Sequence, residues 1–163
     1  MNCVGNENNT EPTFEICNNC SPCKSINKGN FLDVIEVDAA SRTGVDGIRE
    51  IIDAVMYSPN NARFKVYIID EVHMLSNAAF NALLKTLEEP PENVKFIFAT
   101  TEIKKIPATI ISRCQRFDLQ RVDIDTLRTH LSKICESENI KFENDSLFQI
   151  CKASEGSVRD ALS

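Results

Sequence analysis

The sequence lacks any apolar run of the roughly 18 residues that a membrane span needs, and its first residues, Met-Asn-Cys-Val-Gly, do not resemble an export signal. We therefore expect a soluble, cytoplasmic protein. A basic excess is also lacking, because 24 acidic residues stand against 18 basic ones and the net charge is −6. Proteins that bind nucleic acid on their own usually carry a positive surface, so we expect any DNA contact to need a local patch or partner subunits.

Cysteine is plentiful but unevenly placed. Four of the seven cysteines fall within the first 23 residues, at Cys3, Cys17, Cys20 and Cys23. An odd, clustered set in a chain without an export signal indicates metal binding and not a disulfide framework. Four thiolates can hold one tetrahedral Zn²⁺, so we predict a structural zinc site. The alternative is a group of reduced surface thiols. We interpret the remaining cysteines as core thiols; they are Cys114, Cys135 and Cys151.

From residue 31 onward, strand-like and helix-like patterns alternate. Apolar runs predict strands at 31–37, 64–69 and 96–100 and a short strand at 117–119. Apolar residues at helical spacing predict one helix from residue 45 and another that Ser76 caps. This order is typical of an α/β domain with a mostly parallel sheet. After residue 121 the pattern is purely helical, with three helices. We therefore divide the chain into a cysteine module (1–30), an α/β core (31–121) and a helical domain (122–163).

The strongest local motif is an apolar strand that ends in Asp70 and Glu71. Parallel sheets bind ligands at the carboxyl ends of their strands. In nucleotide hydrolases an aspartate in this place holds Mg²⁺ through its water shell, and an adjacent glutamate polarises the attacking water. The alternative is that the two carboxylates simply end a strand and begin a loop.

Several motifs together resemble the clamp-loader ATPases of the AAA+ superfamily. Ile-Asp-Glu-Val-His-Met-Leu-Ser (69–76), followed by Asn-Ala-Leu-Leu-Lys-Thr-Leu-Glu-Glu-Pro-Pro (81–91), resembles their Walker B segment. Ala-Thr-Thr (99–101) resembles sensor 1, Ser-Arg-Cys (112–114) their arginine-finger box, and residues 156–163 their sensor 2 helix. The segment at 36–42 is similar to the gamma/tau family of bacterial DNA polymerase III. The resemblance covers nearly the whole chain.

The resemblance implies roles for single residues. Asp70 and Glu71 would be catalytic, and Thr101 would orient water or touch the γ-phosphate, although most AAA+ relatives have asparagine there. Arg113 would be an arginine finger that acts on a neighbouring subunit's nucleotide, and Arg159 would contact nucleotide bound to its own subunit. The alternatives are a strand-end threonine bonded to backbone, a surface salt bridge for Arg113 and a plain helix charge for Arg159.

The resemblance also implies cofactors and partners. ATP and Mg²⁺ would be bound, and the four amino-terminal cysteines would form the zinc module of the family. The partners would be other clamp-loader subunits (delta, delta-prime and copies of gamma/tau), the sliding clamp and primed DNA. The function would be ATP-driven loading of the clamp for the replicative DNA polymerase III holoenzyme. The alternative is a non-catalytic subunit, similar to delta-prime, that contributes an arginine finger and a zinc module but does not hydrolyse ATP.

One family motif is not in the sequence. A phosphate loop of the form G-x-x-x-x-G-K-[ST] occurs nowhere among the 163 residues. We therefore expect a fragment of a clamp-loader subunit that does not hydrolyse ATP by itself. The expected fold is an AAA+ three-layer α/β domain whose parallel sheet lacks its first strand. That strand would lie between the strand ending at Thr101 and the one at 117–119, so we expect an open groove beside 96–101.

Overall fold

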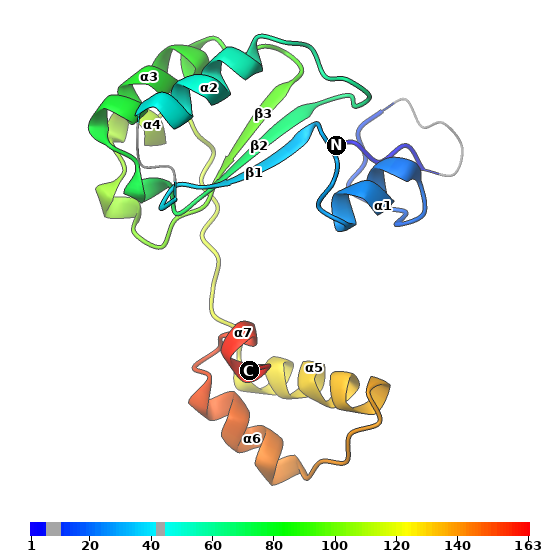
Figure 1. Ribbon diagram of the computed structural model, residues 1–163. Coiled ribbons are helices and arrows are strands. Elements are labelled where there is room, and N and C mark those ends of the chain that lie inside the picture. Colours follow the sequence, from blue (N-terminus) through cyan, green and yellow to red (C-terminus); the bar gives the residue numbers. More distant parts are fainter. Residues whose placement is uncertain (6–10, 42–44) are drawn as a thin grey trace. The chain divides into compact units, whose positions relative to one another are not determined.

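The structure, a computed structural model, describes residues 1–5, 11–41 and 45–163. The chain forms two compact units, Met1–Gln115 and Arg116–Ser163, which are described separately (Figure 1). The division falls six residues before the boundary between core and helical domain that the sequence predicts. No helix among the described residues is long and apolar enough to cross a membrane.

The first unit contains a three-stranded parallel sheet in the order β1-β2-β3. The strands are β1 (Val34–Asp38), β2 (Lys65–Asp70) and β3 (Val94–Phe98). The three predicted strands are thus confirmed, although β3 begins two residues earlier than expected. Asp38 pairs in register with Asp70, so the last residues of β1 and β2 lie side by side at one edge.

Helices α2 (Val45–Val55) and α3 (Asn77–Glu88) cover one face of this sheet (Figure 1). Ser76 caps α3 as predicted, because its side-chain oxygen accepts a hydrogen bond from the Ala79 amide at 3.2 Å. The core between the helices and the sheet consists of buried apolar side chains, which include Val37, Ile48, Ile51, Tyr67, Ile69, Phe80 and Leu83. Burial of this shared face holds the unit together.

The opposite face of the sheet is only partly covered. Ile68 of β2 is half-buried, and Ile97 of β3 is 42% exposed. In the described part of this unit no helix lies against that face, so the expected three-layer arrangement is seen as two layers (Figure 1).

The predicted strand at 117–119 does not form. Phe117 is 74% exposed and Leu119 is 95% exposed, and residues 115–123 have no regular structure. The physical reason is that a strand needs a partner for its backbone hydrogen bonds. Among the described residues β3 pairs with β2 alone, so its other side is an open edge.

The cysteine module contains a short helix, α1 (Ser21–Asn27), which begins directly after Cys20 with a proline in its first turn. Three further short elements were not expected: η1 (Val72–Met74), η2 (Ile103–Lys105) and α4 (Ala108–Ile111). Of the three cysteines interpreted as core thiols, Cys151 is buried, Cys135 is half-buried, and Cys114 is exposed, contrary to the prediction.

The second unit is helical, as predicted, with α5 (Ile124–Ser137), α6 (Asn144–Ala153) and α7 (Val158–Ala161). Its small core consists of Leu127, Leu131, Leu147 and Cys151. Asp123 caps α5 by accepting a hydrogen bond from the Thr126 amide at 2.9 Å. Hydrogen bonds from the Thr126 side chain and backbone lower the pKa of Asp123, so the cap is charged at neutral pH.

Gly156 has no room for a side chain. Its φ is +81°, and an added Cβ would lie 2.7 Å from the carbonyl oxygen of Val122. We expect Gly156→Ala to lower the opening free energy of α5 and α6 by at least about 1–3 kcal/mol, because strained backbone and a backbone clash add together. Hydrogen exchange of the α5 and α6 amides measures this. The matched control is Gly29→Ala, where φ is +67° but nothing lies within 4 Å. If Gly29→Ala increased amide exchange around residue 29 as much as Gly156→Ala increases it in α5 and α6, the clash argument would be contradicted.

Candidate functional site

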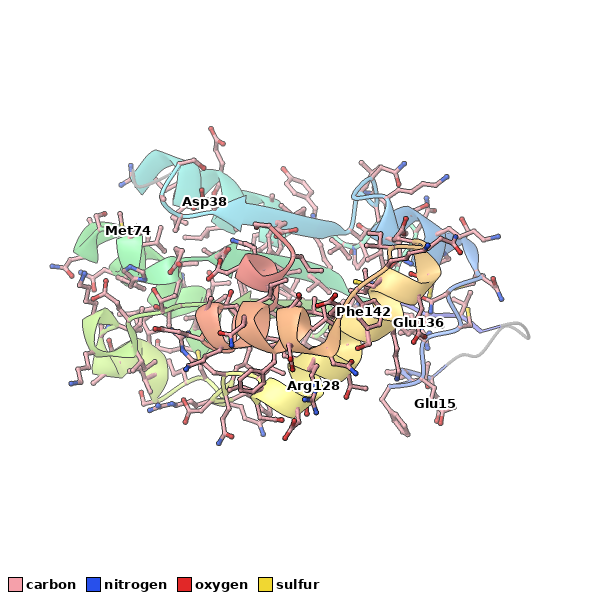
Figure 2. All side chains as sticks on the ribbon, turned by 90° about the horizontal axis from the view of Figure 1, so that it is seen from below. Glu15, Asp38, Met74, Arg128, Glu136 and Phe142 are labelled. Carbon is pink, nitrogen blue, oxygen red and sulfur yellow. The ribbon has the colours of Figure 1, made fainter. Side chains whose placement is uncertain are left out.

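The candidate site lies where β1, β2 and β3 end. Asp70 is the last residue of β2 and is exposed, and Glu71 begins the turn η1. The β2–β3 ladder continues past the strands, since the Ala99 amide donates to Ile69 at 2.9 Å and the Val72 amide donates to Ala99 at 3.0 Å. In Figure 2, Asp38 at the end of β1 and Met74 in η1 lie at the same end of this unit. The sheet therefore places the carboxylates of Asp38, Asp70 and Glu71 at one edge.

Glu71 is held by Thr101 through two hydrogen bonds. Both the hydroxyl and the amide of Thr101 donate to the same oxygen, Oε2, of Glu71, at 3.1 and 3.4 Å. Glu71 has a φ of 46°, in the left-handed region. A non-glycine residue in this region is strained by about 1–2 kcal/mol, and such strain is concentrated at functional sites. Asp70 in turn accepts the Glu71 amide at 2.9 Å.

A histidine that the sequence analysis left without a role completes this cluster. The side chain of His73 is only 7% exposed, and its Nδ1 lies 3.2 Å from Glu71 Oε2 and 3.0 Å from the Thr100 hydroxyl. Its Nε2 lies 3.4 Å from a carboxylate oxygen of Glu102. Hydrogen bonding to Lys105, with a smaller contribution from His73, lowers the pKa of Glu102. The signal in the sequence was the histidine two residues after the strand-end glutamate, in a turn that folds back on β3.

Mg²⁺ and ATP are the cofactors that the sequence implies, and the donor set fits them in part. The Asp70 carboxylate is exposed at the strand end, where it can hold Mg²⁺, and Glu71 is adjacent. The phosphate-binding loop is the part of such a site that these 163 residues do not contain.

Arg113 lies beyond the end of α4 and contacts its own chain. Its Nη2 is 2.6 Å from Glu88 Oε1, at the end of α3, and its Nη1 donates to the Thr109 carbonyl at 2.7 Å. The Arg113 side chain is 33% exposed and that of Glu88 is 50% exposed. Exposed pairs of this kind contribute about 1 kcal/mol or less. The pair can therefore open at little cost, and the guanidinium can reach another partner.

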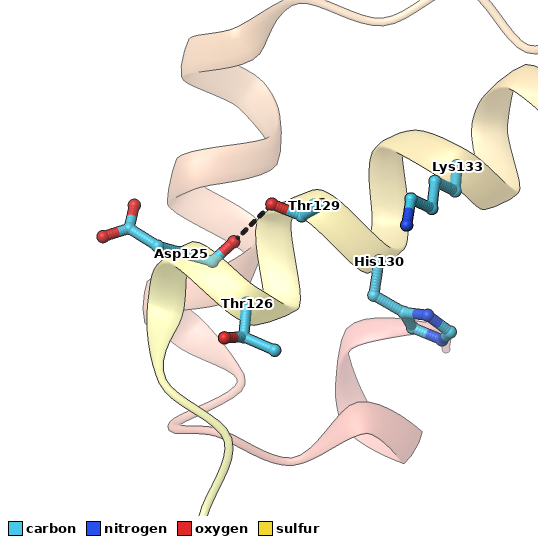
Figure 3. Close-up of a pocket in the computed structure, with 5 residues that line it drawn as sticks. All are labelled: Asp125, Thr126, Thr129, His130 and Lys133. Atoms are coloured by element: carbon cyan, nitrogen blue, oxygen red, sulfur yellow. Dashed lines mark hydrogen bonds between the residues drawn. The ribbon is translucent and has the colours of Figure 1, made fainter.

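Arg159 lies in α7 of the second unit and is exposed. The same unit has a hollow of about 440 Å³ along α5, lined by Asp125, Thr126, Thr129, His130 and Lys133 (Figure 3). All five residues belong to one helix, and Thr129 bonds back to the Asp125 carbonyl. No second element contributes a lining group, so this hollow is not a candidate site.

The four amino-terminal cysteines come together as predicted. Their Sγ atoms all lie within 4.8 Å of one another; Cys3 and Cys23 are buried, and Cys17 and Cys20 are half-buried. A tetrahedral zinc with bonds of about 2.3 Å needs sulfurs about 3.8 Å apart, so a small contraction closes the site. The Cys17 amide donates to Cys3 Sγ at 3.5 Å, and the Cys20 amide to Cys17 Sγ at 3.3 Å. Such bonds favour thiolates, and the donor set fits zinc.

The thiols of this cluster differ in acidity. Burial raises the pKa of Cys20, but hydrogen bonds from backbone and neighbouring thiols outweigh it and lower this pKa to about 6. Burial and hydrogen bonding to Cys20 and Cys3 raise the pKa of Cys23 to about 12. The Cys20 thiol is therefore the more acidic of the two.

Comparison with protein families assigns almost the whole chain. Residues 1–123 match the family described as "DNA polymerase III, delta subunit", and residues 126–163 match "DNA polymerase III clamp loader subunit, ATPase lid domain". The first match ends two residues after residue 121, the predicted end of the α/β core, and the second begins at residue 126.

Individual relatives are similar over about nine tenths of the chain. DNA polymerase III subunit tau of Bacillus subtilis is 57% identical over 93% of this chain and 27% of its own length. The tau/gamma subunit of Haemophilus influenzae is 56% identical over 90% of this chain and 21% of its own length. The gamma subunit of Buchnera aphidicola subsp. Acyrthosiphon pisum is 55% identical over 92% of this chain and 42% of its own length. The chain thus spans between about a fifth and two fifths of the length of these relatives.

Solved structures agree on the fold. A gamma-subunit-related protein of Thermotoga maritima has a TM-score of 0.55 and 28% identity, and the match covers 72% of this chain and 42% of that one. The RuvB Holliday junction branch migration motor of Thermotoga maritima has a TM-score of 0.65 and 18% identity, over 79% and 43% of the two chains. The RuvB likeness shows the fold alone.

Proposed function

We propose that this chain, which belongs to the tau/gamma family of DNA polymerase III clamp-loader subunits, contributes the metal- and water-handling part of an ATP site in a clamp loader. The reaction would drive loading of the sliding clamp onto primed DNA. The partners would be other clamp-loader subunits (delta, delta-prime and gamma/tau copies), the sliding clamp and the DNA, in the cytoplasm at the replication machinery.

The observation that carries this proposal is the contact between Glu71 and Thr101. It joins the residue after β2 to a residue beyond the end of β3, and it turns the Glu71 carboxylate toward a hydroxyl group at the sheet edge. Asp70 would hold Mg²⁺ through its water shell, while Glu71 would accept the proton of the attacking water at its carboxylate. Thr101 would orient that carboxylate or the water. Bound Mg²⁺–ATP would supply the phosphoryl group and the cation that neutralises its charge.

Two arginines would complete the site from different places. Arg113 would leave Glu88 and reach the γ-phosphate of nucleotide on a neighbouring subunit. Arg159, in the helical unit, would contact nucleotide bound to its own subunit. The four cysteines Cys3, Cys17, Cys20 and Cys23 would hold a structural Zn²⁺ that orders the amino-terminal module (1–30). The α/β core (31–121) and the helical lid (122–163) would make up the rest of the chain.

A second candidate function has one observation in its favour. The 163 residues contain no G-x-x-x-x-G-K-[ST], the motif that cradles phosphates in P-loop ATPases. A subunit similar to delta-prime would then contribute Arg113 and the zinc module to its neighbours without hydrolysing ATP. In that case Asp70 and Glu71 would be remnants with no effect on turnover.

A chimera separates the two candidates. In a gamma subunit that keeps its own phosphate loop, the segment aligned with this chain is replaced by residues 1–163. ATP-dependent loading of the clamp onto primed DNA is then measured in the reconstituted clamp loader. We expect the chimera to load clamps and Glu71→Gln to abolish loading while ATP binding persists. Glu138→Gln, an exposed glutamate on the helical unit, is the matched control. A Glu71→Gln chimera as active as the parent would contradict the catalytic role and favour the second candidate.

A further inference from the structure

Arg63 connects the cysteine cluster to the sheet. It lies two residues before β2, and its Nη2 donates a hydrogen bond to the carbonyl oxygen of Cys3, 60 residues away in the sequence. Next to it, the Asn2 side chain donates to the Phe64 carbonyl at 2.8 Å and accepts the Phe64 amide at 3.0 Å. Asn2 is only 6% exposed. These bonds hold the start of the chain, including one cysteine, against the segment that leads into β2.

The Arg63 guanidinium is incompletely satisfied. Its Nε and Nη1 are buried, and neither has a hydrogen-bond partner in the part of the chain that the structure describes. A buried charged donor without a partner is strongly unfavourable and requires an explanation. The guanidinium lies against the backbone of a cysteine whose sulfur is one of four gathered in one place. Thiolates in this cluster would supply negative charge that can balance a buried cation.

We propose that Arg63 is the charge partner of the metal centre formed by Cys3, Cys17, Cys20 and Cys23, stabilising it from outside the ligand shell. This inference rests on the zinc site of the proposed function. Four thiolates around one divalent cation carry a net charge of 2−, and a buried cation beside them offsets part of that charge. Arg63 thus favours the metal-loaded state over the metal-free one.

The test is zinc affinity, measured by competition with a chromogenic chelator. We expect Arg63→Gln to bind zinc about ten- to a hundredfold more weakly than the parent chain, the size typical for groups around a metal site. Arg63→Lys keeps the charge, so its affinity should stay near the parent's. Arg128→Gln, an exposed arginine of the helical unit, is the control and should change nothing. The absorption of the Co²⁺ form should show four sulfur ligands in every variant, because no ligand is removed.

The outcomes separate this inference from the proposal on which it rests. A parent chain that binds no zinc overturns the zinc site itself. A parent that binds zinc, with Arg63→Gln equally tight, overturns the role of Arg63. Loss of affinity to the same degree in Arg63→Lys and Arg63→Gln also overturns it, because the shape of the arginine and not its charge would then matter. Thermal unfolding gives a second test. If Arg63→Gln lowers the stability of the chelator-treated, metal-free chain as much as it lowers that of the metal-loaded chain, Arg63 has a packing role only, and the proposal is overturned.

Discussion

Replacing Arg113 with alanine is expected to slow ATP hydrolysis at a neighbouring subunit's site by about 10³–10⁵-fold, the effect of an arginine finger in the best-measured nucleotide hydrolases. The fold of the mutant chain itself should persist. The Arg113–Glu88 contact joins two partly exposed side chains at 2.6 Å, and such surface pairs add about 1 kcal/mol or less to stability. The measurement is single-turnover hydrolysis in clamp loaders reconstituted with the chimeric subunit.

A mixed assembly makes this test specific. When one subunit carries Arg113→Ala, the site that fails should be its neighbour's, while the mutant's own site keeps working. Glu88→Gln releases the guanidinium from its carboxylate without removing it, so hydrolysis should be retained. Arg116→Ala is the matched control, because Arg116 lies three residues further on and pairs with Asp118 at 2.7 Å. Failure of the mutant's own site, with the neighbour spared, would show that Arg113 does not act across the subunit boundary.

The fold was predictable where the pattern is strong and local. The strands around Val66 and Phe96 are nearly continuous apolar runs, and Ser76 marks the start of α3 by a cap that the structure contains. The predicted strand at 117–119 does not form, for a reason that lies outside the segment. Its residues have strand-like side chains, but among the described residues no further strand pairs with β3 beside which it could lie. Strand formation depends on a partner, and no pattern within three residues shows whether one is present.

For the candidate site, the sequence predicted which residues end the strands but not all of the contacts that they make. Chain order placed Asp70, Glu71 and Thr101 at the carboxyl edge of a parallel sheet, and the structure brings Glu71 and Thr101 into contact. The contacts of His73 were not predicted, because a turn of 3₁₀ helix carries its ring to Thr100, two residues beyond β3. Arg63 was missed because its contact with Cys3 spans 60 residues.

Removal of the metal site should unfold one part of the molecule and spare the rest. We expect the parent chain to contain one zinc ion and Cys23→Ser to retain less than about half an equivalent, since the buried Cys23 thiol is one of the four proposed ligands. Structural zinc contributes apparent binding free energies of about 10–16 kcal/mol in small zinc modules, and that free energy acts where the site closes. Amide hydrogen exchange should therefore rise sharply in the described residues 1–5 and 11–30.

The α/β core should remain protected in the same experiment, because its stability comes from contacts that the metal does not make. Ile48, Ile69 and Leu83 are fully buried between the sheet and its two helices, and none of them depends on the cysteine module. Only the first residues of β2 should loosen, through the bonds of Asn2 to Phe64. Cys114→Ser, at an exposed cysteine outside the cluster, is the control and should keep its zinc. A full equivalent of zinc in Cys23→Ser would show that the cluster is a group of thiols and not a metal site. Exchange that rises equally in β2 and α3 would show instead that zinc holds the whole unit together.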